Sequence, residues 1–467
     1  MTALEDLTRT FSGRIITDPA EAEPFLVDWR QQWRGSSRAV LQPETVDDVV
    51  AAVRWCQRHS IPIVPQGGNT GLSGGATPDA SGDAVLISLA RMNRIRSIDL
   101  ANDTMAVDAG CLLATVQEAA ARAGRLFPLS LAAEGSCTIG GNLATNAGGT
   151  SVLRYGNMRD LCLGVEVVTA EGEVWNGLRG LRKDNAGIDL RDLYIGSEGT
   201  LGIITGAIVR LFPQPAARVV AFAGVPSPTA AIEILRLARG MLGADLTAFE
   251  IVSRAALDLV FEHLPGRKRP LETNPDWYLL IENTDHQSED LAREKLEGLL
   301  AKAFDSGFTE DAVIGTSMEQ SRALWSLREG VGEAQAKAGK AIKHDIAVPI
   351  SSIAGFLSEA DAQIAKRWPS ARLITFGHIG DGNLHYNLSP PRGEDGSTLA
   401  GELDAINGAV HDIVVRHGGT ISAEHGLGQL RAAEAARYKS PVELALMRRI
   451  KDALDPKGLM NPGKVFA

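Results

Sequence analysis

The segment HIGDGNLH holds two histidines whose spacing could bring them to one metal ion. The Asp-Gly pair in its middle is a favoured two-residue hairpin turn, and with that pair as the loop His378 lies directly opposite His385. Opposed side chains on one face of a hairpin have Cβ atoms ~4.5–5.5 Å apart. Glu424 follows later in the chain, and two histidines with one carboxylate form a common zinc set that manganese or iron can also use. The alternative is that the histidines cap turns and bond to carbonyl groups.

Three glycine-rich segments lie in the first half of the chain, each beside an expected strand. They are PQGGNTGLSGG (65–75), AEGSCTIGGNLATNAGG (133–149) and IGSEGTLG (195–202). Glycine lets backbone N–H groups approach a ligand closely because no Cβ intervenes, and phosphates are the usual ligands. The first segment contains neither the Rossmann nor the P-loop fingerprint. One such segment alone could be a turn, but three together suggest walls around one extended, anionic cofactor.

The composition is that of an ordinary globular protein. Of 467 residues, 44% are hydrophobic and 22% charged, which excludes the disordered and fibrous classes. The net charge of −10, without a basic run, argues against a nucleic-acid partner. The four cysteines are far apart and form no C-x-x-C, so we expect buried free thiols. Because the N-terminus has no apolar signal region and no run approaches ~18 apolar residues, we expect a cytoplasmic protein without a transmembrane segment.

The elements that would position these groups divide the chain into two main parts. Thr45 and Asp48 form a T-x-x-D helix start within a strand–helix–strand unit that leads to the first glycine-rich segment. The segment PQPAAR (213–218) marks a boundary, after which strands and helices alternate, with a helix expected at 317–337 and strands expected at 341–350 and 418–423. The second part is expected to be an α+β domain with an antiparallel sheet. The expected divisions are a first domain at 1–215 with an N-terminal arm at 1–37, a second domain at 216–454, and a C-terminal tail at 455–467.

Taken together, these motifs resemble a known flavoprotein family. The glycine-rich segments, with YGNMRDLCLGVEVVTAEGEV between the second and the third, look like the FAD-binding domain of the vanillyl-alcohol oxidase / p-cresol methylhydroxylase superfamily. The second half resembles the D-2-hydroxyglutarate dehydrogenase / D-lactate dehydrogenase branch, through FGHIGDGNLHYN, AEHGLG and LDPKGLMNPGKVF. The resemblance covers about residues 38–467. It implies a two-part FAD-binding domain followed by an α+β substrate and metal-binding cap domain.

The resemblance also implies which residues hold the FAD. Residues of the first glycine-rich segment would hold the pyrophosphate, and residues of the second would line the dinucleotide. Residues around the third segment would complete the site, together with one asparagine from the C-terminal tail. In chain order they are Pro65, Gly67, Gly68, Asn69, Thr70, Gly71, Leu72, Gly135, Ser136, Gly140, Gly141, Thr145, Asn146, Gly148, Glu198, Gly199, Gly202, Ile204 and Asn461. Relatives with a covalent flavin often use a histidine in the first loop, which has none here, so non-covalent FAD is expected.

By the same resemblance, His378, His385 and Glu424 would bind the metal, and the chain would oxidise a D-2-hydroxy acid by hydride transfer to flavin N5. The metal would lower the pKa of the substrate hydroxyl, and His425 would be the general base. Asn387, on the same face as the two histidines, would also contact substrate. D-2-hydroxyglutarate dehydrogenases hold the distal carboxylate with an arginine and a lysine, which correspond to Arg328 and Lys343. The expected reaction therefore converts D-2-hydroxyglutarate to 2-oxoglutarate.

Several alternatives remain at this stage. Four residues after Arg328 such enzymes commonly have a hydroxyl side chain, and here the position is Gly332, so D-lactate, glycolate or D-malate are alternative substrates. For His425 the alternative is a structural role beside the metal ligands, and for Arg328 and Lys343 it is a solvated position on the surface. A metal-dependent hydrolase or a non-catalytic flavin-binding protein would be a different class. The expected electron acceptor is an electron-transfer flavoprotein or a quinone rather than NAD or oxygen, and a homodimer is conceivable.

Overall fold

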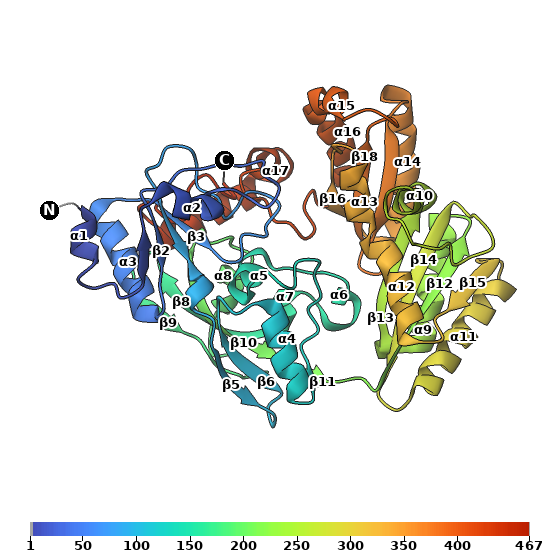
Figure 1. Cartoon of the computed structure of the whole chain (residues 1–467), viewed down its shortest axis with the longest axis horizontal. Coiled ribbons are helices and arrows are strands. Elements are labelled where there is room, and N and C mark those ends of the chain that lie inside the picture. The colour runs from blue at the N-terminus through green and yellow to red at the C-terminus, as the bar shows by residue number, and fades with distance from the viewer. Residues whose placement is uncertain (1–2, 467) are drawn as a thin grey trace. The chain divides into compact units, whose positions relative to one another are not determined.

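The computed structural model describes residues 3–466 and contains two compact units (Figure 1). The first unit comprises Met1–Gly149, Gly156–Gln214 and Glu424–Ala467. The second comprises Thr150–Tyr155 and Pro215–Ala423. This corrects the expected division, because the chain returns to the first unit at Glu424 and not at residue 455. The returning segment is held there by hydrogen bonds such as that from Lys451 Nζ to the carbonyl oxygen of Thr200, at 2.7 Å.

The first sheet of the first unit confirms the expected strand–helix–strand arrangement. Its strand order is β1 (Arg14–Ile16), β2 (Ala39–Gln42), β4 (Val85–Ser88) and β3 (Ile63–Gln66), with β2 and β3 both parallel to β4. The connecting helix α3 (Val46–His59) begins with the predicted capping box of Thr45 and Asp48. Strand β3 therefore delivers the chain directly to the first glycine-rich loop.

The second sheet of the first unit is antiparallel and carries the other two glycine-rich loops. Its order is β5 (Ile95–Asp99), β6 (Thr104–Asp108), β10 (Gly202–Arg210), β8 (Cys162–Thr169) and β9 (Val174–Asn176). The short strands β7 (Arg125–Leu126) and β11 (Phe212–Pro213) pair separately. The helices of this unit are α1 (Ala3–Leu7), α2 (Pro19–Leu26), α4 (Leu113–Arg122), α5 (Ile139–Thr145), α7 (Met158–Leu161), α8 (Arg191–Tyr194), α17 (Ala432–Tyr438) and α18 (Pro441–Leu454).

All four cysteines are buried free thiols, as expected, and lie in the first unit. Burial raises the pKa of Cys56 and of Cys162 to about 12. It raises the pKa of Cys111 to about 11. These thiols therefore pack as small apolar side chains and are poor nucleophiles at neutral pH.

The second unit is built on the expected antiparallel sheet. Its strand order is β15 (Asp311–Ile314), β12 (Ala217–Val225), β14 (Trp277–Asp285), β13 (Leu246–Ser253), β17 (Arg372–Gly377), β18 (Asn383–Ser389) and β16 (Asp345–Ala347). The helices of this unit are α6 (Val152–Tyr155), α9 (Pro228–Leu242), α10 (Arg254–His263), α11 (Glu289–Asp305), α12 (Met318–Glu329), α13 (Val331–Lys337), α14 (Ile353–Arg367), α15 (Ser397–Gly401) and α16 (Leu403–Arg416).

Helices cover both faces of this sheet, and each face has its own core. On one face, Val219, Ala221 and Ile281 pack in a core with α9, α11, α14 and α16. On the other, Val220 and Phe222 pack in a core with α10, α12 and α13. Alternate residues of one strand thus point to opposite cores, as the two-residue period of a strand requires.

Three expected elements of this unit differ from prediction. The helix expected at 317–337 is split into α12 and α13 at Gly330, where a Cβ would lie 2.8 Å from Leu264 Cδ1, so the close approach of α10 marks the break. The strand expected at 341–350 is reduced to β16 because its first part pairs irregularly with β18. The strand expected at 418–423 is a single bridge between Thr420 and Ala347. Among the described residues 3–466, no helix has the length and apolar character needed to cross a membrane.

Candidate active site

The first two glycine-rich loops are in such close contact that side chains would not fit between them. A Cβ on Gly67 would lie 2.4 Å from Thr138 Oγ1, and one on Gly68 would lie 2.0 Å from the carbonyl oxygen of Ser136. Thr138 is the N-cap of α5 and its hydroxyl accepts the Gly141 N–H at 3.3 Å. Glycine at these two positions is therefore required by the close packing of the first loop against the Thr138 side chain and the Ser136 backbone.

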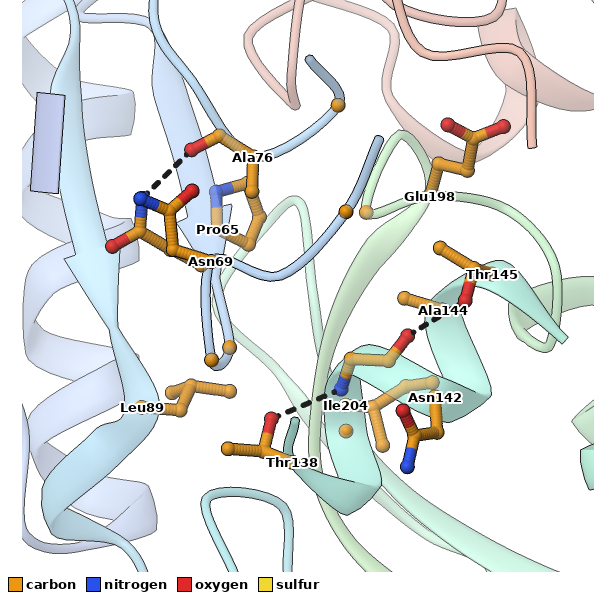
Figure 2. Close-up of a pocket in the computed structure, with 18 of the residues that line it drawn as sticks. Pro65, Asn69, Ala76, Leu89, Thr138, Asn142, Ala144, Thr145, Glu198 and Ile204 are labelled. Carbon is orange, nitrogen blue, oxygen red and sulfur yellow. Dashed lines mark hydrogen bonds between the residues drawn. The ribbon is translucent and has the colours of Figure 1, made fainter. Parts of the chain in front are cut away.

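The three glycine-rich loops together line one cavity, drawn in Figure 2, with about 930 Å³ of atom-free space that is partly open to solvent. Many of the expected FAD-binding residues line it. They are Pro65, Gly67, Gly68, Asn69, Thr70, Gly71, Gly140, Gly141, Thr145, Glu198, Gly199, Gly202 and Ile204. The loops therefore converge as the sequence predicts.

Some expected FAD-binding residues lie elsewhere. Ser136 lines a neighbouring hollow. The side chain of Asn146 accepts the Arg159 N–H at 2.9 Å, and Asn461 Nδ2 donates to the carbonyl oxygens of Gly75 and Glu198 at 2.9 and 2.8 Å. These two asparagines tie loops together. The remaining expected residues that do not line the cavity are Leu72, Gly135 and Gly148.

The cavity is also lined by residues that were not predicted to bind cofactor. Thr138 could have been found, because a threonine three residues before a glycine-rich helical turn is a capping signal. Gln66 and Ser73 have no such signal, because a lone polar residue beside glycines is ordinary in a turn. His425, expected as the base, also lines this cavity.

Glu198 holds the segment that carries His425. Its carboxylate accepts the backbone N–H groups of Leu427 and Gly428 at 2.7 and 2.8 Å. Burial raises the pKa of Glu198, although these two hydrogen bonds oppose the shift. Ser73 Oγ donates to the carbonyl oxygen of His425 at 3.2 Å. The first and third glycine-rich loops therefore fix the backbone around His425.

The histidine hairpin of the second unit has a different register from the one expected. Phe376 lies opposite His385, so His378 falls in the connection between β17 and β18 and not opposite His385. The two-residue turn is wrong because the connection bonds to its surroundings: Gly380 N–H donates to the carbonyl oxygen of Phe249 at 3.1 Å. The register differs by two residues, an even number, so the face of the sheet is retained.

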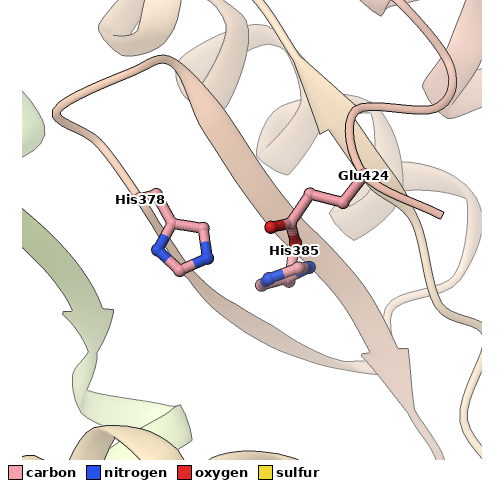
Figure 3. A group of neighbouring side chains, drawn as sticks. All are labelled: His378, His385 and Glu424. Atoms are coloured by element: carbon pink, nitrogen blue, oxygen red, sulfur yellow. The ribbon is translucent and has the colours of Figure 1, made fainter. Parts of the chain in front are cut away.

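The two imidazoles are nevertheless close, with ring centroids 5.8 Å apart. Glu424 is the residue after Ala423, whose N–H donates to the carbonyl oxygen of Asp345 at 3.2 Å, and Asp345 lies opposite His385 in β18. The backbone itself thus leads Glu424 to the hairpin. One possible ligand atom from each of His378, His385 and Glu424 lies within 4.8 Å of the others (Figure 3). This group meets the geometric requirement that the sequence suggested.

Glu250, on β13, connects the hairpin to α12. Its Oε1 lies 2.7 Å from His378 Nδ1, and its Oε2 accepts the Nε–H of Arg328 at 2.8 Å. Burial would raise the pKa of this carboxyl, but His378 and Arg328 lower it below its ordinary value. Glu250 was not predicted from the sequence, although a charged residue inside the apolar strand LTAFEIVS is a signal of a buried ion pair.

The predicted substrate residues of the second unit gather on one face of its sheet. Arg328 is buried and lies over the Phe376 ring, 4.8 Å from its centroid. Lys343 is half-buried and, by continuation of the β16–β18 register, falls opposite Asn387. The Asn387 amide is already engaged, since its Oδ1 accepts the His344 N–H and its Nδ2 donates to Gln335 Oε1, both at 3.0 Å. The Asn387 amide therefore holds the segment before β16 and helix α13 to β18.

Comparison with known proteins identifies the family. Residues 214–465 match the family model described as FAD linked oxidases, C-terminal domain, and residues 37–177 match the model described as FAD binding domain. The chain belongs to the FAD-linked oxidases. It is 41% identical to mitochondrial D-2-hydroxyglutarate dehydrogenase of Bos taurus over 99% of this chain and 83% of the relative. It is 39% identical to D-2-hydroxyglutarate dehydrogenase of Xanthomonas citri pv. viticola over 97% of this chain and 94% of that protein.

Solved structures confirm the fold of this FAD-linked oxidase. The crystal structure of p-cresol methylhydroxylase with substrate bound matches with a TM-score of 0.74 and 16% identity, covering 99% of this chain and 96% of the other. The expected fold of the p-cresol methylhydroxylase type is thereby confirmed. The match to the FAD binding domain model and the relatives named D-2-hydroxyglutarate dehydrogenase confirm the expected class of FAD-dependent dehydrogenase. The cytoplasmic location stays a prediction, since the Bos taurus relative is named as mitochondrial.

Proposed function

We propose that this FAD-linked oxidase is a dehydrogenase that converts D-2-hydroxyglutarate to 2-oxoglutarate with FAD and one divalent metal ion. One observation carries the proposal: Glu250 joins a histidine of the metal-ligand group to the buried cation of Arg328. A D-2-hydroxy diacid has a hydroxy-carboxylate at one end and a second carboxylate at the other, which suits a metal and a guanidinium on one face of a sheet. The names of the two relatives support the same substrate.

The residues fit FAD in the first unit. At Gly67 and Gly68 the backbone of the first loop packs directly against Thr138 and Ser136, and because these glycines carry no side chain the peptide N–H groups of the loop border the cavity there. The cavity is bordered by all three glycine-rich segments, as an extended dinucleotide requires. The first loop offers no histidine for a covalent bond, so the proposed binding is non-covalent. When bound, FAD supplies the acceptor for the hydride that leaves C2 of the substrate.

The donor set of the second site fits a divalent metal, with zinc as the proposed ion. Two imidazoles and one carboxylate leave coordination positions for substrate oxygens. Because Nδ1 of His378 is engaged by Glu250, its Nε2 is the nitrogen that would bind the metal. When bound, the metal lowers the pKa of the substrate hydroxyl.

The remaining roles fall to side chains of this chain. His425 accepts the hydroxyl proton of the substrate on a ring nitrogen and so acts as the general base. Arg328 uses Nε for Glu250, which leaves its two terminal nitrogens for the distal carboxylate, and Lys343 adds a second positive charge. Asn387 orders the strand beside Lys343. Electrons would pass on to an electron-transfer flavoprotein or a quinone.

The test is anaerobic mixing of the purified protein with D-2-hydroxyglutarate, D-lactate, D-malate and L-2-hydroxyglutarate, while the visible flavin band is followed. We expect D-2-hydroxyglutarate to bleach the band fastest, and a chelator to slow that bleaching. Equal bleaching by D-lactate would contradict the assignment of a distal carboxylate site. Bleaching that is indifferent to chelation would contradict the metal.

A further inference from the structure

Glu250 is a single buried carboxylate that holds two proposed functional residues at once. The residue is only 1% exposed, and each of its oxygens has one partner: His378 Nδ1 at 2.7 Å and Arg328 Nε at 2.8 Å. These partners come from the hairpin connection after β17 and from α12, which are far apart in sequence. Under the proposed function they belong to opposite ends of the substrate, because His378 binds the metal and Arg328 binds the distal carboxylate.

The bond to His378 determines which ring nitrogen faces the metal. An ionised carboxylate can only accept hydrogen bonds, so Nδ1 of His378 must carry the proton in this contact. The lone pair is then on Nε2, and the plane of the ring is fixed by the Nδ1–H bond. Without Glu250 the ring could rotate or change tautomer, and the ligand would lose its orientation.

The bond to Arg328 determines where the guanidinium points. The Nε–H of Arg328 is donated to Glu250, and its planar guanidinium lies over the Phe376 ring. Together these two contacts set the position and the tilt of the guanidinium. Phe376 is itself opposite His385 in the β17–β18 pair. The cation and the two histidines are thus tied to one another through the sheet of the second unit, with Glu250 as the direct link.

We propose that Glu250 is a positioning residue that sets the distance between the metal and the guanidinium, and so selects the length of the diacid substrate. This inference rests on the proposed function for the identity of the two ends. A rigid link of this kind favours the five-carbon D-2-hydroxyglutarate over the four-carbon D-malate, because only one separation of the two carboxylates matches. It also makes metal affinity depend on a residue that is not a ligand.

The test compares Glu250→Asp and Glu250→Gln with Glu282→Gln as the matched control. Asp keeps the negative charge, so Arg328 is not left as an unpaired buried cation, but the side chain is one methylene too short to keep both contacts. Gln can accept only on its oxygen and loses one of the two bonds. Glu282 is likewise a buried carboxylate on the same face of the sheet, but its partners are Trp325 and Arg218.

Metal affinity is measured by competition with a chelating dye for zinc, and circular dichroism confirms folding. We expect both Glu250 variants to bind zinc about 10- to 100-fold more weakly, the range for loss of a partner to a ligating histidine, and Glu282→Gln to bind as the parent does. We also expect the ratio of kcat/KM for D-2-hydroxyglutarate over D-malate to fall at least several-fold in Glu250→Asp.

Two results would overturn the inference. Unchanged zinc affinity in folded Glu250→Asp would show that Glu250 does not orient His378 for the metal. An unchanged ratio of kcat/KM for the two substrates would show that Glu250 does not select the length of the substrate. Failure of the proposed function has a different signature. In that case the parent protein would not oxidise D-2-hydroxyglutarate at all, while the zinc comparison would still report on Glu250.

Discussion

Lys343 and Arg328 differ at the residue scale in how strongly the protein holds them. Arg328 is buried, paired with Glu250 and stacked on Phe376, whereas Lys343 is half-buried in the irregular segment before β16. A lysine is a point charge on a flexible stem, so its contribution to a carboxylate depends on distance more than on geometry. Removing Lys343 should therefore affect binding of the diacid without disturbing the sheet.

We expect Lys343→Ala to raise KM for D-2-hydroxyglutarate by about 10-fold or more, the effect of ~1.4 kcal/mol, the usual scale for a hydrogen bond to a charged group. KM for D-lactate, which has no distal carboxylate, should change little. Steady-state kinetics with both substrates measure the difference. Lys337→Ala is the control, because it removes a lysine that pairs with Glu333 on the exposed side of α13. A variant with unaltered D-2-hydroxyglutarate kinetics would exclude Lys343 from the site.

The sequence predicted single residues better than the pairs they form. His378, His385 and Glu424 were selected by residue type, and the structure brings them together. The turn between the histidines was wrong, because the contact of Gly380 with Phe249 joins residues far apart in the chain, which local turn preferences do not reveal. Glu250 was missed for a related reason: its meaning depends on two partners from distant elements.

At the scale of elements, two neighbouring glycines have opposite surroundings: Gly330 lies between α12 and α13, and Gly332 lies within α13. A Cβ on Gly332 would meet no atom within 4 Å, whereas one on Gly330 would lie 2.8 Å from both Leu264 Cδ1 and the Ser326 carbonyl oxygen. We expect Gly332→Ala to raise the free energy of unfolding by about 0.5–1 kcal/mol, the helix-propensity difference. Gly330→Ala should lower it by about 1–3 kcal/mol through overpacking. Urea unfolding measures both free energies, and equal effects of the two substitutions would contradict the different surroundings of the two glycines.

The junction of β14 and α11 is stabilised in a pH-dependent way. The hydrogen bond from Lys295, followed by that from the Gln287 backbone, lowers the pKa of Asp285 to about 2. Because the folded pKa is below the ordinary value, the stabilisation is fully present above pH ~4 and is lost as the pH falls toward 2. Asp285→Asn should lower the urea midpoint at pH 7, and the difference from the parent should shrink between pH 4 and 2. Asp290→Asn, in the exposed first turn of α11, is the control.

At this scale, the helices and strands that could be predicted are those whose signals lie within a few residues of one another. The helix start at Thr45 and the strand leading to the first loop were predicted because capping and apolar alternation are encoded within a few residues. The prediction of a strand at 418–423 was wrong, because the apolar pattern of this segment does not reveal that its pairing is limited to one bridge, between Thr420 and Ala347. The break at Gly330 needed knowledge of α10, which packs there.

At the scale of the whole molecule, the cofactor cavity and the histidine hairpin belong to units with separate cores. A ligand that binds only the folded form of one unit stabilises that unit by mass action. We expect added FAD, at about 100 times its Kd, to stabilise the first unit of flavin-free protein by about 2.7 kcal/mol. Differential scanning calorimetry should show this as an upward shift of one transition. A shift of the same size with riboflavin, which lacks the pyrophosphate, would contradict the role given to the glycine-rich loops.

The first unit is assembled from segments that lie at both ends of the sequence, with the second unit inserted between them. Asn461, in the segment that follows the second unit in the chain, bonds to backbone oxygens of two glycine-rich segments, at Gly75 and Glu198. On the ribosome this segment emerges after the whole of the second unit. The walls of the flavin cavity are therefore completed only once the second unit has been synthesised, so a chain that is terminated within the second unit lacks a finished cavity.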